Sequence, residues 1–208
     1  EEKYMNSKNL LPILCIVFLV VNCKSAKTQA VWKEYENNPV VTMGESGTWD
    51  AGALGSMTTL KVGNVYHLYY EAWGVRTDTV WSREEYNTLQ IGHATSKDGK
   101  HWVKDTATPV IPQGTENTWD ADGTWDPFVI YEDGIFKMWY GGNYKDDCEW
   151  GYAVSGDGSH FEKKGKISEL GEVEDCHVVH DKENNRYYMY YWDREYEPNG
   201  LSRAESPN

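Results

Sequence analysis

Acidic residues stand close before apolar runs at three places in this sequence. Asp126 precedes Pro-Phe-Val-Ile, and the pair Glu174 and Asp175 precedes Cys-His-Val-Val. Asp50 lies shortly before a third run, Ala-Leu-Gly-Ser-Met-Thr-Thr-Leu. Carboxylates that meet at one site can serve as general acid and general base, since a neighbouring negative charge raises the pKa of the proton donor. These residues are our candidate catalytic groups, provided that the fold brings the three places together.

An internal repeat predicts the elements that could do this. One repeated pattern, such as VYHLYYEAW, alternates apolar and aromatic residues after a turn that contains Gly or Asn, which is typical of the second strand of a hairpin. A second pattern follows it, and its first two copies share an Asp-Gly turn and a closing aromatic residue. The patterns occupy residues 65–73, 135–143 and 186–194, and residues 91–102, 150–161 and 200–208. We therefore predict an all-β chain with about three units of four strands, which is typical of propeller blades.

A third match, at an offset of 70 residues, relates residues 32–41 to residues 102–111. It predicts that residues 32–36 form the outermost strand of a further blade. Propellers usually close with at least four blades, and the third repeat stops within its second pattern. We therefore expect this chain to be the N-terminal part of a longer protein. The alternative is a complete small domain whose last repeat is eroded.

In a propeller the first strand of each blade lines the central axis, so the acidic residues at the strand entrances are expected to converge there. The offset of 70 complicates the prediction for Asp50, because it pairs Asp50 with Asp120 and gives Asp126 the counterpart Ser56. The alternative for each Trp-Asp pair is a turn in which the carboxylate accepts backbone N–H groups. His177, on the third inner strand, is a candidate for substrate contact or a structural residue.

Composition narrows the class of partner. The 208 residues carry a formal charge of −13, which argues against nucleic acid as a partner because binding to phosphates needs clustered Lys and Arg. The 10 Trp, 15 Tyr and 4 Phe residues could stack on the faces of sugars, or they could fill a β-rich core. The candidates for substrate binding are Trp49, Trp73, Trp125 and Trp139, together with Asp175 and His177.

The N-terminal region has the pattern of an export signal. Residues 1–23 contain Lys8, an apolar run from Leu10 to Val21 and then Cys23. The run is short for a membrane span and fits a secretory signal peptide. We expect a lipoprotein signal that starts at Met5, a lipid anchor at Cys23 on the bacterial envelope, and a linker over residues 24–30. The alternatives are a plain cleaved signal, which would release the protein, and an uncleaved anchor.

The sequence lacks the motifs of several other kinds of active or binding site. There is no G-x-S-x-G motif and no Gly-rich phosphate loop, and no second pair of metal ligands has the spacing of a zinc site. We therefore expect no cofactor and no metal, with a structural cation on the axis as an open alternative. Cys148 and Cys176 could form a disulfide in an oxidising compartment.

The segments WDPFVIYEDGIFKMWYGG, WGYAVSGDGSHFEK and IGHATSKDGKHWVKDTATPVI resemble the five-bladed propeller glycosidases, which are glycoside hydrolase families 43 and 32 and their relatives. The resemblance covers residues 31–208. It implies a five-bladed propeller with Asp50 as catalytic base, Asp126 as the residue that tunes a pKa, and Glu174 as general acid. The context departs from the family pattern at Asp50, which runs into Ala-Gly-Ala, and at Glu174, which lacks the usual Pro two residues later.

The resemblance implies a glycoside hydrolase that acts on poly- or oligosaccharides by acid/base catalysis, with inversion if the chain is similar to family 43. One alternative is a glycan-binding surface lipoprotein without catalysis on the same scaffold. Another is a sialidase-like propeller, which would need an arginine cluster. Arg76 and Arg83 are the arginines in suitable entry loops.

Overall fold

The computed structural model describes residues 32–74, 89–105, 108–142, 148–194 and 200–207. Residues 32–36 belong to a different unit from the strands, which all lie in the unit that begins at Asn37. The described residues contain strands and no helix, so the all-β prediction is confirmed and no described helix could cross a membrane. The predicted signal peptide, the lipidation site Cys23 and the linker lie outside the described residues.

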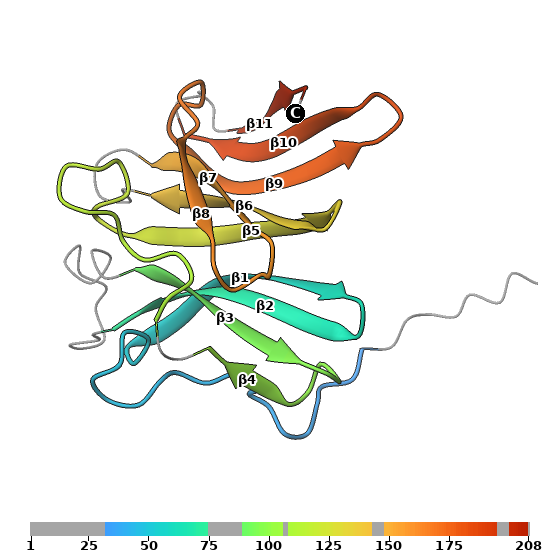
Figure 1. Cartoon of the computed structure of the whole chain (residues 1–208). Helices are drawn as coiled ribbons and strands as arrows, with labels where there is room; N and C mark the ends of the chain where they lie inside the picture. The colour runs from blue at the N-terminus through green and yellow to red at the C-terminus, as the bar shows by residue number, and fades with distance from the viewer. Residues whose placement is uncertain (1–31, 75–88, 106–107, 143–147, 195–199, 208) are drawn as a thin grey trace, which may run out of the picture. The chain divides into compact units, whose positions relative to one another are not determined.

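Three antiparallel sheets follow one another along the chain (Figure 1). The first contains β1 (Ala53–Val62), β2 (Val65–Trp73), β3 (Gln90–Ser96) and β4 (Trp102–Lys104). The second contains β5 (Thr124–Glu132), β6 (Ile135–Gly142), β7 (Glu149–Ser155) and β8 (Glu162–Lys166). The third contains β9 (Val173–Asp181), β10 (Arg186–Asp193) and β11 (Gly200–Ser206). The prediction of about three propeller blades is confirmed.

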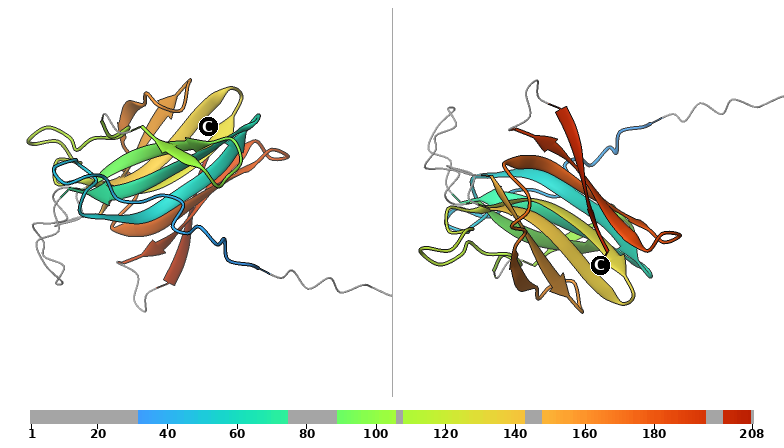
Figure 2. Two further views of the ribbon diagram at one scale, coloured as in Figure 1. Left: turned by 90° about the horizontal axis from the view of Figure 1, so that it is seen from below. Right: turned by 90° about the horizontal axis from the view of Figure 1, so that it is seen from above.

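The sheets are stacked in chain order, with the second between the other two. Viewed from below, the first sheet faces the reader, and viewed from above, the third does (Figure 2). The first strands of the sheets are near one another, since β5 contacts both β1 and β9. This arrangement brings the three strand entrances toward one region, as the sequence predicted.

Local sequence explains the hairpins within each sheet. Asp133 and Gly134 join β5 to β6, and both have positive φ angles, 51° and 82°. Two successive residues with positive φ form the type I′ turn, which matches the twist of paired strands and favours Asp-Gly. The same Asp-Gly signal led to the strand prediction.

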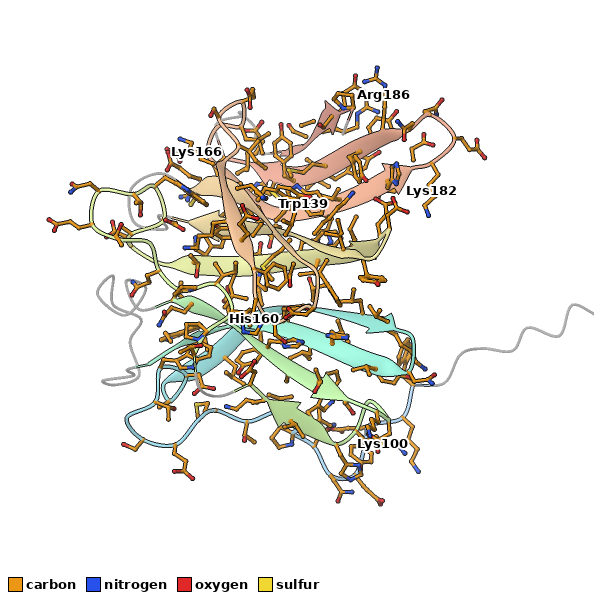
Figure 3. The ribbon with its side chains drawn as sticks, in the orientation of Figure 1. Lys100, Trp139, His160, Lys166, Lys182 and Arg186 are labelled. Carbon is orange, nitrogen blue, oxygen red and sulfur yellow. The ribbon has the colours of Figure 1, made fainter. Side chains whose placement is uncertain are left out.

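Aromatic side chains fill the space between the sheets. One core cluster includes Tyr69, Met138 and Tyr140, and another includes Trp125, Trp139 and Met189. Because strands in the middle of the stack are covered on both faces, they lack the simple alternation of buried and exposed residues. Trp139, labelled in Figure 3, lies between the second and third sheets. The high content of aromatic residues is therefore largely explained by packing.

Residues 32–36 do not form the predicted outer strand. They have no strand structure, and the side chain of Trp32 is 95% exposed. A β-strand needs a neighbouring strand to satisfy its backbone hydrogen bonds, and no described strand pairs with these residues.

Candidate functional site

Two of the predicted acidic residues sit in β-bulges at the entrances of their strands. On β5 the pairing register shifts between Trp125 and Phe128, and Asp126 has a φ angle of 47°. A matching shift occurs between β9 and β10, where Asp175 has a φ angle of 52°. Bulges redirect side chains and are common beside active sites, and Asp tolerates positive φ better than most residues. The two bulges therefore turn equivalent residues of neighbouring sheets in the same way.

Hydrogen bonds connect these bulges across the sheets. The backbone N–H of Asp126 donates to Oε2 of Glu71 on β2, at 2.9 Å. The carboxylate of Asp126 in turn accepts the backbone N–H of Asp175 and the hydroxyl of Ser56. The backbone N–H of Ser56 also donates to Glu71. Each of the three sheets thus contributes to one site, and we call Glu71, Asp126 and Asp175 the carboxylate cluster.

The electrostatics of the carboxylate cluster favour a proton on Asp126. Burial raises the pKa of Asp126 to about 7, and the negative charges of Glu71 and Asp175 add to this effect. Hydrogen bonds from Asp175 and Ser56 only partly oppose the rise. The pKa of Glu71 is also raised, mainly by burial. A carboxyl group that keeps its proton near neutral pH can act as a general acid.

Sequence analysis missed Glu71. Its place beside Asp126 depends on a close approach to β1, because a Cβ atom on Gly55 would lie only 2.0 Å from Oε1 of Glu71. Gly55 therefore leaves the space that this carboxylate occupies. The signal in the sequence was a lone acidic residue within the aromatic strand VYHLYYEAW.

Asp50 is held in a different environment. Its carboxylate is 2% exposed, accepts Lys104 Nζ on β4 at 2.5 Å, and accepts the Thr48 hydroxyl at 2.8 Å. Burial would raise its pKa, but the bonds from Lys104 and Thr48 outweigh this, so the pKa lies below its usual value. Within the described residues, Asp50 shares no hydrogen-bond partner with Asp126.

Asp120 repeats this arrangement in the second sheet. It accepts Lys163 Nζ at 2.6 Å and the Thr118 hydroxyl at 3.0 Å. Both Asp residues also accept a tyrosine hydroxyl, from Tyr70 or Tyr140, at 3.4 Å. Side-chain donors therefore hold both carboxylates, where the turn alternative expected backbone N–H groups, and the structure does not join Asp50 to the carboxylate cluster.

Glu174 is also engaged outside the carboxylate cluster. Its Oε1 atom lies 3.0 Å from Nη1 of Arg194 and 3.5 Å from Sγ of Cys148. Asp175, the next residue, is exposed and belongs to the site. Cys148 and Cys176 are buried free thiols, so the possible disulfide is not formed.

Most of the predicted aromatic contacts are core residues. Trp73, Trp125 and Trp139 are at most 9% exposed, and Trp49 stacks on Tyr70 with ring centroids 6.2 Å apart. Exposed His177 instead contacts Phe128, with ring centroids 5.0 Å apart. Each of these two residues follows its bulge closely in sequence, so they form an aromatic surface beside Asp126 and Asp175.

The structure does not test the predictions about a sialidase-like arginine cluster and about cofactors. Arg76 and Arg83, which a sialidase-like site would use, lie outside the described residues. Across the described ranges, no group of three His, Cys, Asp or Glu side chains is placed to hold a metal ion. That the function needs no cofactor stays a prediction.

Comparison of the sequence with known proteins finds similarity to two enzymes that process glycans. No family model matches the sequence. The chain is 25% identical over 162 residues to a 1,2-beta-oligomannan phosphorylase of Thermoanaerobacter sp., which covers 76% of this chain and 52% of that protein. It is 31% identical over 104 residues to a beta-1,2-mannobiose phosphorylase of the same organism, covering 40% and 34%. The chain spans about half or less of the length of the curated relatives it matches.

Solved structures decide the fold. A glycosyl hydrolase from Bacteroides ovatus superposes with a TM-score of 0.69 and 18% identity, over 86% of this chain and 56% of that one. The chain has the fold of the propeller glycosidases. A family 117 glycoside hydrolase from Zobellia galactanivorans has a TM-score of 0.64 at 14% identity, over 81% and 56%. The beta-1,2-mannobiose phosphorylase from Listeria innocua has a TM-score of 0.58 at 17% identity, over 84% and 62%. Hydrolases and a phosphorylase thus share this propeller fold.

Proposed function

We propose that this propeller unit belongs to an enzyme that cleaves glycosidic bonds, with Asp126 as the proton donor. The observation that carries the proposal is the environment of Asp126, whose pKa lies near 7 beside two other carboxyl groups. Its bulge on the first strand of the middle sheet places it between residues from both neighbouring sheets. The likeness to propeller glycosidases supports the class of reaction.

The proposed reaction begins with protonation of the leaving group. The Asp126 carboxyl gives its proton to the glycosidic oxygen, and the bond between that oxygen and the anomeric carbon breaks. In hydrolysis, a water molecule attacks the anomeric carbon and passes its proton to a carboxylate. We assign this role of base to Asp175, since it is exposed at the same site. Phe128 and His177 offer a surface on which a sugar ring can rest.

This assignment changes the roles that the family resemblance implied. Asp126 becomes the acid instead of the residue that tunes a pKa, and Glu71 takes over the tuning. Asp50 and Glu174 have no catalytic role in the proposal, because Lys104 and Arg194 neutralise their carboxylates.

Phosphorolysis is a second candidate reaction. The two relatives with a named activity are phosphorylases of β-1,2-linked mannosides. In that reaction phosphate attacks the anomeric carbon directly, so one proton donor suffices and no carboxylate base is required. A site in which Asp126 is the acid and Asp50 is held by Lys104 meets this requirement for a single catalytic carboxyl group.

Product analysis separates the candidates. The protein is incubated with β-1,2-manno-oligosaccharides and with other plant and algal oligosaccharides, with and without phosphate, and products are followed by NMR. Sugar 1-phosphate formed only with phosphate indicates a phosphorylase, and free reducing sugar without phosphate indicates a hydrolase. Asp126→Asn is expected to lose activity at least about 100-fold, whereas the control Asp122→Asn is not. Binding without any turnover would instead favour the glycan-binding alternative.

The envelope location also remains a proposal, and it rests on the sequence of residues 1–23. Export with a lipid at Cys23 would place the unit where polysaccharide fragments enter the cell. Metabolic labelling with a clickable fatty acid is expected to mark the natural chain and to miss the Cys23→Ala variant. Equal labelling of both would contradict the anchor.

A further inference from the structure

The first strand of the first sheet carries a β-bulge, as β5 and β9 do. On β1 the pairing register shifts between Leu54 and Met57, and the exposed residue Ser56 lies within the shift. The repeat offset of 70 residues pairs Ser56 with Asp126. A hydroxyl group therefore stands in the first sheet where the second and third sheets have the carboxyl groups of Asp126 and Asp175.

The glycine beside this bulge lies on a different strand in the second sheet. In the first sheet it is Gly55 on β1, and the carboxylate of Glu71 on β2 occupies the space beside it. The offset of 70 pairs Gly55 with Trp125 on β5, and it pairs Glu71 with Gly141 on β6. A Cβ atom on Gly141 would lie 2.4 Å from Cε2 of Trp125, so there an indole takes the space. The first sheet thus supplies its carboxylate from β2 and keeps Ser56 as the neutral group on β1.

Two hydroxyl groups of β1 hold the bulge of β5. The Ser56 hydroxyl donates to the carboxylate of Asp126, and the Thr58 hydroxyl donates to the carbonyl oxygen of Pro127 at 2.5 Å. Ser56 is itself fixed, because its backbone N–H donates to Glu71. Two consecutive residues of β5 are therefore bonded to hydroxyl groups of the neighbouring sheet.

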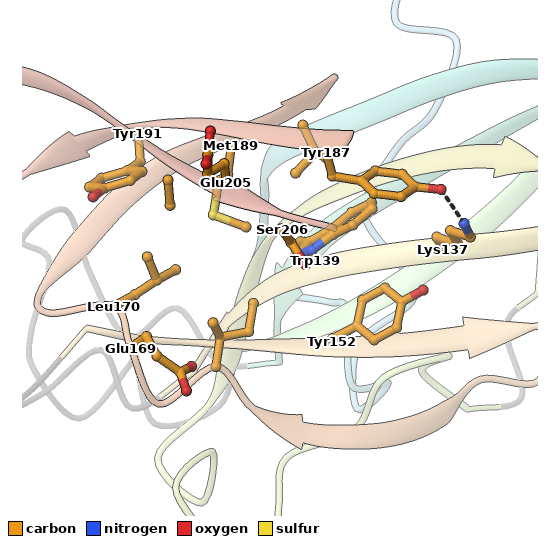
Figure 4. Close-up of a pocket in the computed structure, with 13 residues that line it drawn as sticks. Lys137, Trp139, Tyr152, Glu169, Leu170, Tyr187, Met189, Tyr191, Glu205 and Ser206 are labelled. Carbon is orange, nitrogen blue, oxygen red and sulfur yellow. Dashed lines mark hydrogen bonds between the residues drawn. The ribbon is translucent and has the colours of Figure 1, made fainter. Parts of the chain in front are cut away.

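The far end of β5 is held by residues of the second and third sheets. Lys137 Nζ lies 3.0 Å from Oε2 of Glu132 and donates to the Tyr187 hydroxyl at 2.6 Å (Figure 4). The carboxylate of Glu132 also contacts His180 and Tyr187. These contacts join β5 to β9 and β10. The two hydroxyl groups of β1 act at the opposite end of β5, beside Asp126.

We propose that Ser56 is a positioning residue whose hydroxyl orients the Asp126 carboxyl and stabilises the carboxylate that forms when Asp126 gives up its proton. By rotating, a hydroxyl group can accept a hydrogen bond from the protonated carboxyl and donate one to the charged form. The proton of Asp126 passes to the glycosidic oxygen, and Ser56 keeps its own. A hydrogen bond to a charged acceptor is about twice as strong as one to a neutral acceptor, so the bond from Ser56 strengthens during the transfer.

The neutral side chain of Ser56 suits this role. The charges of Glu71 and Asp175 favour the protonated form of Asp126, whereas the hydrogen bond from Ser56 favours the charged form. A carboxylate in place of Ser56 would add a further negative charge and make release of the proton harder. The inference rests on the proposed function, because it gives Ser56 a part in the same reaction.

Carbon-13 NMR titration of the Asp126 carboxyl tests the contact without a measurement of activity. In Ser56→Ala the bond to the charged form is lost, so the pKa of Asp126 is expected to rise by about one unit. Ser56→Thr keeps the hydroxyl and is expected to keep the natural value. The control Thr59→Ala, which removes an exposed hydroxyl from the same strand, is also expected to keep it. An unchanged pKa in Ser56→Ala, or equal rises in the Ala and Thr variants, would overturn the proposal.

Rates distinguish a failure of this inference from a failure of the proposed function. On the oligosaccharide that product analysis identifies, Ser56→Ala is expected to lose about tenfold in kcat with little change in KM. On a glycoside with a dinitrophenyl leaving group, which needs no proton, it is expected to lose little. A lower melting temperature without a change in the pKa of Asp126 would make Ser56 merely structural and overturn the proposal. A raised pKa with unchanged rates on both substrates would instead contradict Asp126 as the proton donor.

Discussion

The backbone N–H of Asp126 lies 2.9 Å from Oε2 of Glu71, so a carboxylate of the first sheet holds the bulge of the second. The same contact places negative charge next to the Asp126 carboxyl and helps to raise its pKa. Glu71 therefore contributes both to the position of Asp126 and to its raised pKa, of which burial is the main cause. Glu71 positions Asp126, and Asp126 is the group that we expect to meet the substrate.

Replacing Glu71 with Gln is expected to lower the pKa of Asp126. The amide can still accept the N–H of Asp126, but the neighbouring negative charge is gone. Since a general acid must be protonated, activity falls as pH rises through its pKa, and this fall is expected about one pH unit earlier in the variant. Carbon-13 NMR of the Asp126 carboxyl measures the shift directly. The exposed control Glu116→Gln is expected to leave it unchanged, and an unchanged pKa in Glu71→Gln would contradict the role of Glu71.

Asp126→Asn is expected to stabilise the fold while it removes activity. The folded-state pKa of Asp126, about 7, exceeds the unfolded value, so the native state binds more protons than the unfolded state between about pH 4 and pH 7. Stability therefore declines as pH rises through this range. The neutral amide avoids the loss, and a gain of about 1–3 kcal/mol is expected at pH 8.

Thermal melting at two pH values measures that gain. At pH 8 the variant is expected to melt several degrees above the natural protein, since 1 kcal/mol corresponds to about 2–4 °C at this size. At pH 4 the two are expected to melt together. A variant that is less stable at pH 8 would show that the charged form of Asp126 is favoured in the fold.

The buried pair His67 and His93 is expected to make the protein sensitive to acid. Their rings share a hydrogen bond between Nδ1 of His67 and Nε2 of His93, which lie 3.0 Å apart. Burial lowers the pKa of both, to about 4 for His93, where the charge of His67 adds to the effect and that of Asp157 opposes it. The unfolded state then binds more protons below about pH 6.5. Stability from this pair is complete above that pH and declines toward pH 4.

Urea unfolding as a function of pH isolates this contribution. Between pH 7 and pH 4 the loss from the pair is expected to be on the order of 2 kcal/mol. It opposes the trend from Asp126, so the comparison is best made in the Asp126→Asn background. The His93→Gln variant is expected to show a shallower pH dependence than its parent. An unchanged dependence would mean that the pair does not titrate below its usual range.

Asp50→Asn is expected to affect stability more than chemistry. Removing the charge leaves Lys104 without its buried partner, and breaking such pairs typically costs about 3–5 kcal/mol, or less where water reaches the cation. Asp120→Asn is the matched control, because it breaks the equivalent pair with Lys163. Both variants are expected to lose stability to a similar extent and to keep kcat at permissive temperature. A selective loss of kcat in Asp50→Asn alone would restore Asp50 as a catalytic base.

The fold was readable from the sequence because the repeat is strong. The hairpin signal Asp133-Gly134 and the offset of 70 residues give strand order and number without any knowledge of packing. The prediction of a strand at residues 32–36 was wrong. Their sequence resembles β4, but a strand also needs a neighbouring strand to pair with, and no described strand pairs with these residues.

The site was only partly readable. Asp126 stood out since Pro and an apolar strand follow it, but its partner Glu71 lies within another strand and 55 positions away. The ion pair between Asp50 and Lys104 joins residues 54 positions apart, so composition could not distinguish Asp50 from a catalytic residue. At Glu174 and Asp175 the β-bulge determines which of the two side chains faces the site. The positive φ angle of Asp175, which forms this bulge, cannot be predicted from the sequence alone.

The most direct test of Asp126 as proton donor is the dependence of the rate on the leaving group. The natural protein and Asp126→Ala are compared on two substrates with the same sugar, one an oligosaccharide and one with a dinitrophenyl leaving group that needs no proton. We predict that the variant loses at least about 100-fold in kcat/KM on the oligosaccharide and keeps most of its rate on the dinitrophenyl glycoside. Equal losses on both substrates would contradict the assignment of Asp126 as general acid.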